Sequence, residues 1–306
     1  MLAGTPLPRR QTRHPRAEGR NDLAGVSDRH EENELTGKEL SNALRGGRRV
    51  YGTLIVSMSP KWPHAVRSTG ADFVFIDTEH IPIDRAALSW MCRTYAAMGL
   101  PPIVRIPSPD PIEACKVLDG GACGIIAPYV ESARQVRELV GATKLRPLKG
   151  KRMEEALEDP DALEPPLRDY LDEFNSGNIL VVNIESVPAV ENLDAILGVP
   201  GLDAVIIGPH DLSVSLGTPE QYTNPVFDGV VRDIIQRARN CNVAAGMHFW
   251  EGIEQEIEWA KAGANLIVHS GDISIFAQTL REDLTKMRQA LGDDAPLSGT
   301  DGAATV

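Results

Sequence analysis

Eight apolar segments rich in valine and isoleucine recur along this chain, and a segment with helical spacing follows each of them. The apolar segments predict strands at Val50–Met58, Phe73–Asp77, Ile103–Ile106, Gly124–Pro128, Ile179–Ile184, Ala204–Ile207, Val243–Phe249 and Leu266–His269. The intervening segments predict helices at Pro63–Thr69, Arg85–Met98, Pro111–Leu118, Ala133–Gly141, Ala189–Leu197, Phe227–Asn240, Ile253–Ala262 and Ile273–Leu291. Strands that alternate with helices pair in parallel through right-handed crossovers, and eight such units close a barrel. The sequence therefore predicts an α/β fold, a (β/α)8 TIM barrel.

The barrel is predicted to occupy residues 36–292 as a single domain, with a disordered arm at residues 1–35 and a disordered tail at residues 293–306. A doubly wound sheet is the alternative, but no Gly-x-Gly-x-x-Gly turn follows the first strand. Just before that strand, "ELTGKELSNALRGGRR" has the spacing of a short helix. We expect this helix to close the barrel floor, the end at which the strands begin.

One connection interrupts the regular alternation. Residues 144–178, "KLRPLKGKRMEEALEDPDALEPPLRDYLDEFNSGN", separate the fourth barrel helix from the fifth strand. Connections of this length are usually functional or mobile. We predict that this segment is a lid over the barrel mouth or part of an interface with a neighbouring subunit.

The composition narrows the class of partner. A formal net charge of −12 argues against nucleic acid or an anionic membrane as the main partner. The four cysteines form no Cys-x-x-Cys pair and are read as reduced thiols, and no apolar run approaches the roughly 20 residues of a membrane span. We expect a cytoplasmic protein. The five arginines among the first twenty residues resemble a mitochondrial transit peptide, but three prolines make import the less favoured reading.

Polar side chains follow several of the predicted strands, at the end where TIM barrels carry their active sites. They are Asp77, Glu79 and His80 after the second strand, Arg105 in the third, Asn183 and Glu185 at the fifth, His210 and Asp211 after the sixth, His248 in the seventh, and His269 and Asp272 at the eighth. Asp110 and Asp272 are interpreted as helix N-caps and His269 as a structural residue. His248 stays open between a structural and a functional interpretation.

Glu185 and Asp211 follow adjacent strands, with no cysteine and few histidines beside them. Two carboxylates suit a hard divalent ion such as Mg²⁺ or Mn²⁺, which keeps open positions for water and a chelating substrate. An α-keto acid offers that chelate through a carboxylate oxygen and its ketone oxygen. The ion would stabilise the enolate that forms when a neighbouring C–C bond breaks, and Arg105 would place a fixed positive charge beside the same oxygen.

His80 is predicted to be the acid–base group of this site, because it lies between acidic neighbours on the functional rim. Asp77, three residues earlier, is predicted to fix the tautomer of the imidazole. Glu79 is predicted to orient a metal-bound water.

The motifs "FVFIDTEH", "IVRIP", "VLDGGACGIIAPYV", "VVNIESVPAVENLDAIL" and "AVIIGPHDLSVSLG" follow one another along the chain. In residues and spacing they resemble the HpcH/HpaI aldolase family, and the resemblance covers Gly52 to Asp272. It implies a barrel of the phosphoenolpyruvate/pyruvate type and a class II pyruvate aldolase that depends on a divalent metal, Mg²⁺, Mn²⁺ or Co²⁺.

The resemblance also implies roles for single residues. These are metal ligation by Glu185 and Asp211, contact with the pyruvate oxygen by Arg105, acid–base steps by His80 with Asp77, and contact with the pyruvate carboxylate by Gly208, Pro209 and the backbone around Asp211. Asp119 corresponds to an acid that lies, in the family, at a subunit contact beside the site. The last helices of family members exchange between partners, so a homo-oligomer, trimer or hexamer, is expected.

Several residues depart from the family pattern. Asn183, Leu54, His210 and Tyr129 stand where Gln, Trp, Ala or Ser, and Met are usual, and "LKGKRMEEAL" replaces an Arg-Gly-x-Gly loop. These positions shape the pocket of the second substrate, so Asn183 and His210, with Glu79, are predicted to bind substrate while the acceptor stays open. The departures are also similar to the macrophomate synthase-like branch of the family. By that analogy Tyr170 would hydrogen-bond an acceptor carbonyl.

The function predicted first is a divalent-metal-dependent carbon–carbon lyase that generates a pyruvate enolate by cleaving or forming 4-hydroxy-2-oxo acids. The nearest alternative is an oxaloacetate decarboxylase and C–C bond-forming synthase like macrophomate synthase. A citrate-lyase-like acyl-CoA lyase would need a basic groove for the CoA phosphates, for which "RPLKGKR" is the available segment. The alternative from another class is a non-catalytic barrel that binds a metabolite.

Overall fold

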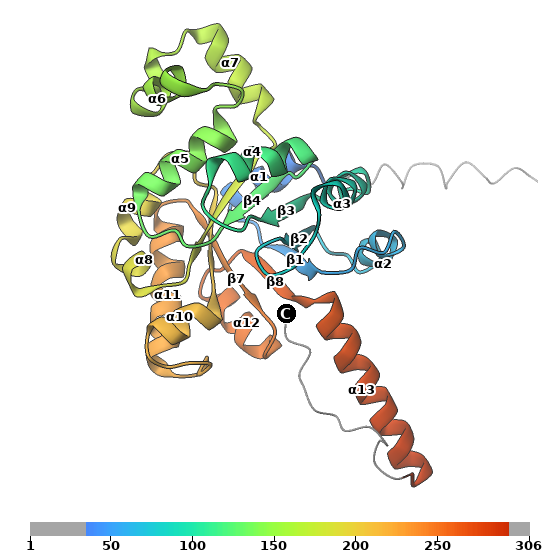
Figure 1. Ribbon diagram of the computed structural model, residues 1–306. Helices are drawn as coiled ribbons and strands as arrows, with labels where there is room; N and C mark the ends of the chain where they lie inside the picture. The colour runs from blue at the N-terminus through green and yellow to red at the C-terminus, as the bar shows by residue number, and fades with distance from the viewer. Residues whose placement is uncertain (1–34, 294–306) are drawn as a thin grey trace, which may run out of the picture. The chain divides into compact units, whose positions relative to one another are not determined.

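The computed structural model of this chain describes residues 35–293 and contains a closed barrel of eight parallel strands in the order β1 to β8 (Figure 1). The strands are β1 (Val50–Ile55), β2 (Phe73–Asp77), β3 (Pro102–Arg105), β4 (Gly124–Ala127), β5 (Ile179–Ile184), β6 (Ala204–Ile207), β7 (Ala244–Phe249) and β8 (Leu266–Gly271). The predicted TIM barrel is confirmed. The predicted disordered arm and tail lie outside the described residues, except for Leu35 and Asp293 at their inner ends.

Helices surround this barrel. They are α1 (Gly37–Arg45), α2 (Trp62–Arg67), α3 (Arg85–Ala97), α4 (Pro111–Gly120), α5 (Ala133–Lys144), α6 (Gly150–Glu158), the 3-10 turn η1 (Pro160–Ala162), α7 (Pro165–Phe174), α8 (Val187–Glu191), α9 (Leu193–Leu197), α10 (Pro209–Ser215), α11 (Pro225–Asn240), α12 (Ile253–Lys261) and α13 (Asp272–Leu291). The single helix predicted at Ala189–Leu197 is in fact two, because the chain turns at Asn192, whose side-chain amide donates to the carbonyl of Glu131. Across residues 35–293, no helix has the length and apolar character needed to cross a membrane.

The strands alternate between two cores, because successive side chains of a strand point to opposite faces of the sheet. On β2, Phe73 and Phe75 pack inside the barrel, while Val74 and Ile76 pack outward against the helices. The same alternation on β3 places Ile103 inside and Val104 outside. Because inward and outward side chains alternate, the last inward-facing residue of each strand lies at the barrel mouth.

The barrel floor is closed by α1, as predicted. Thr36 caps this helix in a capping box with Glu39, which satisfies free amides at its start. Leu40 and Leu44 are fully buried and pack against the inward-facing side chains of the strands. Arg45, in the last turn, forms an ion pair with the buried Asp203 at 2.7 Å.

The long connection of residues 144–178 folds into α6, η1 and α7 around a small core of its own. It leaves the end of α5 and leads into the start of β5, so it lies at the floor end of the barrel (Figure 1). An ion pair at 3.6 Å joins Lys38 of α1 to Glu173 of α7, which agrees with this position. The prediction of a lid over the mouth of its own barrel is therefore wrong, because a segment between a helix and the next strand begins and ends at the floor. The predicted role at a subunit interface stays a prediction.

Candidate active site

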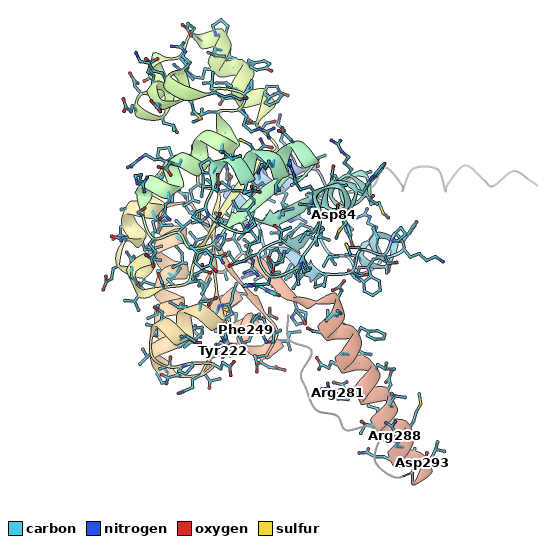
Figure 2. All side chains as sticks on the ribbon, in the orientation of Figure 1. Asp84, Tyr222, Phe249, Arg281, Arg288 and Asp293 are labelled. Atoms are coloured by element: carbon cyan, nitrogen blue, oxygen red, sulfur yellow. The ribbon has the colours of Figure 1, made fainter. Side chains whose placement is uncertain are left out.

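A cavity of about 710 Å³ opens at the carboxyl ends of the strands. The predicted site residues that line it are Asp77, His80, Arg105, Asn183, Gly208, Pro209, His210 and Asp211. Its outer part is lined by Glu220, Tyr222, Trp250 and Glu251, and Tyr222 lies against Phe249 with ring centroids 5.3 Å apart (Figure 2). The strand alternation explains this gathering, because the inward positions that follow the apolar core are polar on β2, β3, β5 and β7.

Arg105 and Asp77 form a buried, two-point ion pair inside the cavity. The guanidinium donates to both carboxylate oxygens of Asp77 at 2.8 and 2.7 Å, and its Nε lies 3.2 Å from Glu79 Oε2. Burial works to raise the pKa of Asp77, but the hydrogen bonds and charge of Arg105 outweigh it and the pKa is lowered. Asp77 also accepts from the amide of Glu79. Asp77 therefore holds Arg105 rather than the imidazole of His80, which corrects the role predicted for it.

His80 lies at the rim of the cavity. Its side chain is about half exposed, and its Nε2 atom is 3.8 Å from Glu79 Oε2. Glu79 in turn accepts a hydrogen bond from the hydroxyl of Tyr129, which raises the pKa of that phenol to about 12. The structure thus brings His80 and Glu79 together, and links Glu79 to Arg105 and Tyr129.

Glu185 is a buried carboxylate without a cationic partner. Its oxygens accept from the amide of Tyr129 at 2.6 Å and from the side-chain amide of Asn183 at 2.7 Å. Burial raises the pKa of Glu185, and the negative charges of Asp211 and Glu79 add to the effect. Within residues 35–293, no Lys, Arg or His lies within ion-pair distance of it.

Two backbone features make room for this carboxylate. A Cβ atom on Gly208 would lie 2.9 Å from both Cβ and Oε2 of Glu185, so only glycine fits there. Tyr129 has a φ of 56°, a left-handed conformation that is costly for a large side chain and that directs its amide at Glu185. In the sequence Tyr129 is notable only as a departure from the family pattern. Neither the residue type nor the motif spacing could have predicted that its backbone amide binds Glu185.

Asp211 and His210 stand at the start of α10, a short helix that the sequence reading did not anticipate although Pro209 follows Gly208 there. Asp211 is largely exposed at the cavity rim. The imidazole of His210 lies between acids, 3.8 Å from Asp211 and 3.7 Å from Glu220.

The described residues contain no cluster of three or more His, Cys, Asp or Glu side chains that would hold a metal ion by themselves. Glu185 and Asp211 nevertheless fit a hard divalent ion that takes its other ligands from water or substrate. The pKa of Glu185 is raised partly by Asp211, and a cation between the two carboxylates would remove this repulsion. Glu185 and Asp211 are thus the oxygen donors of a candidate metal centre.

Four predicted site residues do not line this cavity. Glu79 and Glu185 contact the lining residues Arg105 and Asn183, whereas Asp119 and Tyr170 lie away from it. Asp119 is exposed on α4 and pairs with Arg146, so its predicted place at a subunit contact stays a prediction. Tyr170 lies on α7 at the floor end, stacked on Phe174 with ring centroids 5.7 Å apart. Tyr170 does not reach the cavity of its own barrel, because the long connection lies at the opposite end. Its contact with an acceptor, which would need the cavity of a neighbouring subunit, stays a prediction.

The remaining polar residues at strand ends have structural partners. Asp110 caps α4 through the amide of Ile112, as predicted. His269 pairs with Glu256 at 2.6 Å, which raises the pKa of the imidazole and confirms its structural role. Asp272 is not an N-cap. It is the first residue of α13, and its carboxylate accepts from the amides that follow β1, which ends that strand at Ile55.

Comparison with known proteins places this site in context. The family model described as HpcH/HpaI aldolase/citrate lyase matches residues 51–278. A protein of Klebsiella pneumoniae subsp. pneumoniae named 2-keto-3-deoxy-L-rhamnonate aldolase is 32% identical over 258 residues, which cover 84% of this chain and 95% of that protein.

Solved structures agree with the fold. An HpcH/HpaI aldolase from Desulfitobacterium hafniense DCB-2 has a TM-score of 0.71 at 26% identity, with 85% of this chain and 98% of that chain covered. A citrate synthase has a TM-score of 0.71 at 28% identity, with 83% and 99% covered. Macrophomate synthase, with a TM-score of 0.67 at 24% identity and 82% and 89% covered, shares the fold.

Proposed function

This chain belongs to the HpcH/HpaI aldolase/citrate lyase family, and we propose that its barrel mouth breaks and forms the C–C bond of 4-hydroxy-2-oxo acids through a pyruvate enolate. The chain is a lyase of this family, like its aldolase relatives, so the non-catalytic barrel is set aside. The observation that carries the proposal is the buried Glu185, which is hydrogen-bonded to Asn183 and repelled by Asp211 at the wall of the cavity that Asn183, Asp211 and Arg105 line.

The pyruvate half of the substrate is assigned to the inner cavity. The aldolases of this family depend on a divalent metal, and Glu185 with Asp211 would hold Mg²⁺ or Mn²⁺, with Co²⁺ as a third choice. Such an ion supplies positive charge that polarises the ketone of the substrate. Arg105, fixed at two points by Asp77, adds a charge that does not have to reorganise as the oxygen becomes negative.

The proton steps are assigned to the rim. His80 is exposed to solvent and lies beside Glu79, so its imidazole can exchange protons with water while it faces the cavity. Asn183 holds one oxygen of Glu185, and Gly208 with Pro209 places backbone close to that carboxylate. His210 also lines the cavity with about half of its side chain exposed, and it is proposed to bind the second substrate.

The substrate class is taken from chemistry and from the relatives together. A 2-keto-3-deoxy sugar acid, the class named for the Klebsiella relative, is a 4-hydroxy-2-oxo acid that cleaves to pyruvate and an aldehyde. An acyl-CoA substrate is not supported, because "RPLKGKR" lies between α5 and α6 at the floor end, away from the cavity. Within that segment, Arg146 and Arg152 are paired with Asp119 and Glu164.

The test is exchange of the methyl protons of pyruvate in D₂O, followed by NMR with and without Mg²⁺ or Mn²⁺. We expect exchange that requires the metal, is lost in Glu185→Ala and is slowed in His80→Ala. Oxaloacetate is run beside pyruvate, because decarboxylation that is much faster than exchange would favour the decarboxylase and synthase alternative. Neither reaction with any of these metals would overturn the proposal.

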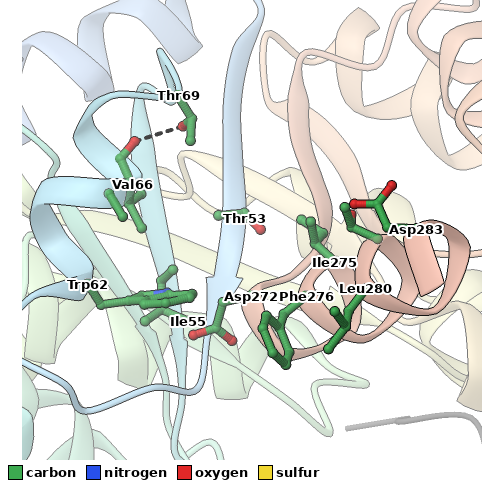
Figure 3. A pocket seen from close by; sticks show the side chains of 12 residues that line it. Thr53, Ile55, Trp62, Val66, Thr69, Asp272, Ile275, Phe276, Leu280 and Asp283 are labelled. Carbon is green, nitrogen blue, oxygen red and sulfur yellow. Dashed lines mark hydrogen bonds between the residues drawn. The ribbon is translucent and has the colours of Figure 1, made fainter. Parts of the chain in front are cut away.

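A homo-oligomer is proposed from α13. Its exposed apolar side chains include Phe276, Leu284 and Met287, and a groove of about 450 Å³ lies between this helix and α2 (Figure 3). Trp62 lines that groove, and its indole Nε1 atom is buried without a hydrogen-bond partner among the described residues. An apolar helix face of this size is costly in water, and the last helix of a second copy would cover it.

The oligomer is tested by light scattering after size exclusion. Phe276→Glu with Leu284→Glu is expected to lower the molar mass to that of a monomer. Thr285→Glu with Gln289→Glu, which adds the same two negative charges on the polar side of α13, is the matched control and should leave the mass unchanged. A wild-type monomer would contradict this part of the proposal without touching the chemistry.

A further inference from the structure

His248 occupies an inward position of β7 at the level of the active site. On this strand Ala244 packs inside the barrel, whereas Ala245, Met247 and Phe249 pack outward against the helices. The alternation of a strand therefore turns His248 inward, and it lines the same cavity as Arg105. The sequence left this histidine open between two interpretations, and the direction of its side chain decides for the cavity.

The tautomer of His248 is fixed by its surroundings. Nε2 lies 3.0 Å from the backbone carbonyl oxygen of Ser270, which can only accept, so Nε2 carries the hydrogen. Ser270 has a φ of 49°, an uncommon conformation for a residue with a side chain, and it holds that carbonyl in place. The ring also meets Phe75 edge-on, with centroids 5.4 Å apart, and Trp250 at 5.4 Å. Nδ1 therefore carries no hydrogen and has a free lone pair. The ring itself is fixed by its contacts with Ser270, Phe75 and Trp250.

This imidazole is neutral at physiological pH. Burial lowers the pKa of His248 to about 4, and the charge of Arg105 contributes in the same direction. The hydrogen bond to Ser270 and the charge of Asp77 act in the opposite direction without cancelling the effect. A neutral ring with its Nε2 hydrogen engaged offers a hydrogen-bond acceptor to the cavity.

The neighbouring carboxylate, amide donor and phenol of the cavity offer no free acceptor of this kind. Both oxygens of Asp77 accept from Arg105, and the side-chain amide of Asn183 donates to Glu185. The phenol of Tyr222 keeps its proton, because burial and nearby acids raise its pKa to about 12. Among the described residues, no protein partner is found for Nδ1 of His248. The acceptors of the inner layer without a hydrogen-bond partner among the described residues are Oδ1 of Asn183, beside the carboxylate of Glu185, and Nδ1 of His248. The complement of Nδ1 in a substrate is a hydroxyl group.

We propose that Nδ1 of His248 accepts a hydrogen bond from the C4 hydroxyl of a 4-hydroxy-2-oxo acid, so that the cavity selects substrates that carry this hydroxyl. The proposal rests on the function proposed above and adds to it the group that recognises the bond to be broken. The neutral ring first orients the hydroxyl through Nδ1, and Nδ1 then takes its one hydrogen as the C3–C4 bond breaks and the C4–O bond becomes the carbonyl of the aldehyde. The proton passes from the ring through water toward the exposed His80 at the rim, and the ring is neutral again. In oxaloacetate C4 is the carbon of a carboxylate, whose oxygens can only accept hydrogen bonds, so this substrate gains nothing from His248.

The test compares two reactions of one enzyme. Cleavage of 2-keto-3-deoxy-L-rhamnonate and of racemic 4-hydroxy-2-oxopentanoate is measured beside decarboxylation of oxaloacetate, as kcat/KM with saturating Mn²⁺. His248→Leu should lower the ratio of cleavage to decarboxylation by about 10- to 100-fold, the effect of leaving one buried hydrogen-bonding group unpaired. Thermal melting of each variant accounts for losses caused by unfolding.

Two amides separate orientation of substrate from support of the fold. His248→Asn places an oxygen near the position of Nδ1, whereas His248→Gln places its amide nitrogen near Nε2, where it can still donate to Ser270. We expect Asn to restore more of the cleavage-to-decarboxylation ratio than Gln. A larger recovery with Gln, or an equal fall of both reactions in every variant, would mean that His248 only supports Ser270.

The outcome for the wild-type chain distinguishes the two proposals. Decarboxylation of oxaloacetate without cleavage of either hydroxy acid would overturn the role of His248 and leave the enolate chemistry standing. Loss of pyruvate exchange, decarboxylation and cleavage together would overturn the proposed function, and the role of His248 with it.

Discussion

Asp203 at the barrel floor and Glu185 at the mouth are both buried carboxylates, but their partners differ. Asp203 is fully buried and accepts from Arg45 at 2.9 and 2.7 Å, from Lys144 at 2.5 Å and from the amide of Leu180 at 2.8 Å. Glu185 accepts from one backbone amide and one side-chain amide, and its nearest charged neighbours include the acids Asp211 and Glu79.

The difference teaches how to tell a structural charge from a functional one. A buried charge is costly unless it is paired and hydrogen-bonded, and the floor carboxylate meets both conditions within the chain. The mouth carboxylate meets only the second. The chain thus keeps at its mouth a negative charge that a ligand must complete, while the floor needs nothing from outside.

The largest expected effect comes from neutralising the charge at the mouth. Glu185→Gln keeps the shape of the side chain but removes the charge, and we expect kcat/KM for cleavage to fall by about 1000-fold or more. Folding should be unharmed, because Arg105, which feels the charge of Glu185, keeps its two hydrogen bonds to Asp77 in this variant. Steady-state kinetics with circular dichroism checks both points. Activity within tenfold of wild type would contradict the prediction, because Glu185 would then have only a structural role, as Asp203 has.

The matching change at the floor should act on stability instead. Asp203→Ala leaves Lys144 buried without its counter-charge, and we expect the free energy of unfolding to fall by about 3 kcal/mol. Glu173→Ala removes the exposed ion pair with Lys38 and is the control, with an expected change within about 0.5 kcal/mol. Urea unfolding measures both. A similar small cost in the two variants would remove the distinction between floor and mouth.

The barrel and its rim could be predicted from sequence because both follow from short-range patterns. The strand from Phe73 to Asp77 was placed with its observed ends, since an apolar run stops abruptly at a charge. The alternation of side chains along a strand is then enough to predict that Asp77, Arg105 and Asn183 point into the barrel. The pairing of Glu185 with Asp211 is predicted from their places after adjacent strands, and the family motifs imply the same pair.

What could not be predicted depends on contacts between distant segments. Asp77 was assigned to His80, three residues away, but Arg105 on the neighbouring strand binds it more strongly through two hydrogen bonds. The role of Tyr170 is predicted by analogy, and only the end at which the long connection leaves the barrel shows that this residue lies away from its own cavity. His248 needed the carbonyl of Ser270, on the next strand, to define its tautomer.

A change at Arg105 tests whether its ion pair with Asp77 at the mouth is purely structural, like the ion pairs of Asp203 at the floor. Arg105→Lys keeps the charge but cannot donate to both oxygens of Asp77, since a lysine ammonium is a point charge. We expect kcat/KM to fall by about 10- to 100-fold, because the charge beside the substrate oxygen is no longer fixed. Kinetics with pyruvate and oxaloacetate check this. A lysine variant as active as wild type would show that the active site needs only a positive charge at position 105, and not the two hydrogen bonds to Asp77.

The smallest effect, and the sharpest comparison, is the pH dependence of stability without metal. Burial raises the pKa of Glu185 above its ordinary value of 4.5. Between 4.5 and the raised pKa the folded chain keeps a proton that the unfolded chain has lost, so the contribution of Glu185 to stability falls as the pH rises. Glu185→Gln has no titrating group at this position, so its free energy of unfolding should rise relative to that of the wild type as the pH increases across this window.

Urea unfolding in EDTA from pH 4 to pH 8 measures this difference between wild type and variant. Added Mn²⁺ should reverse it, because an ion that binds the folded state stabilises the wild type and finds no charged carboxylate at position 185 in the variant. A difference that does not change with pH would mean that Glu185 is already compensated within the chain, as Asp203 is. The mouth would then hold no charge waiting for a ligand, and the contrast between the two ends of the barrel would fail.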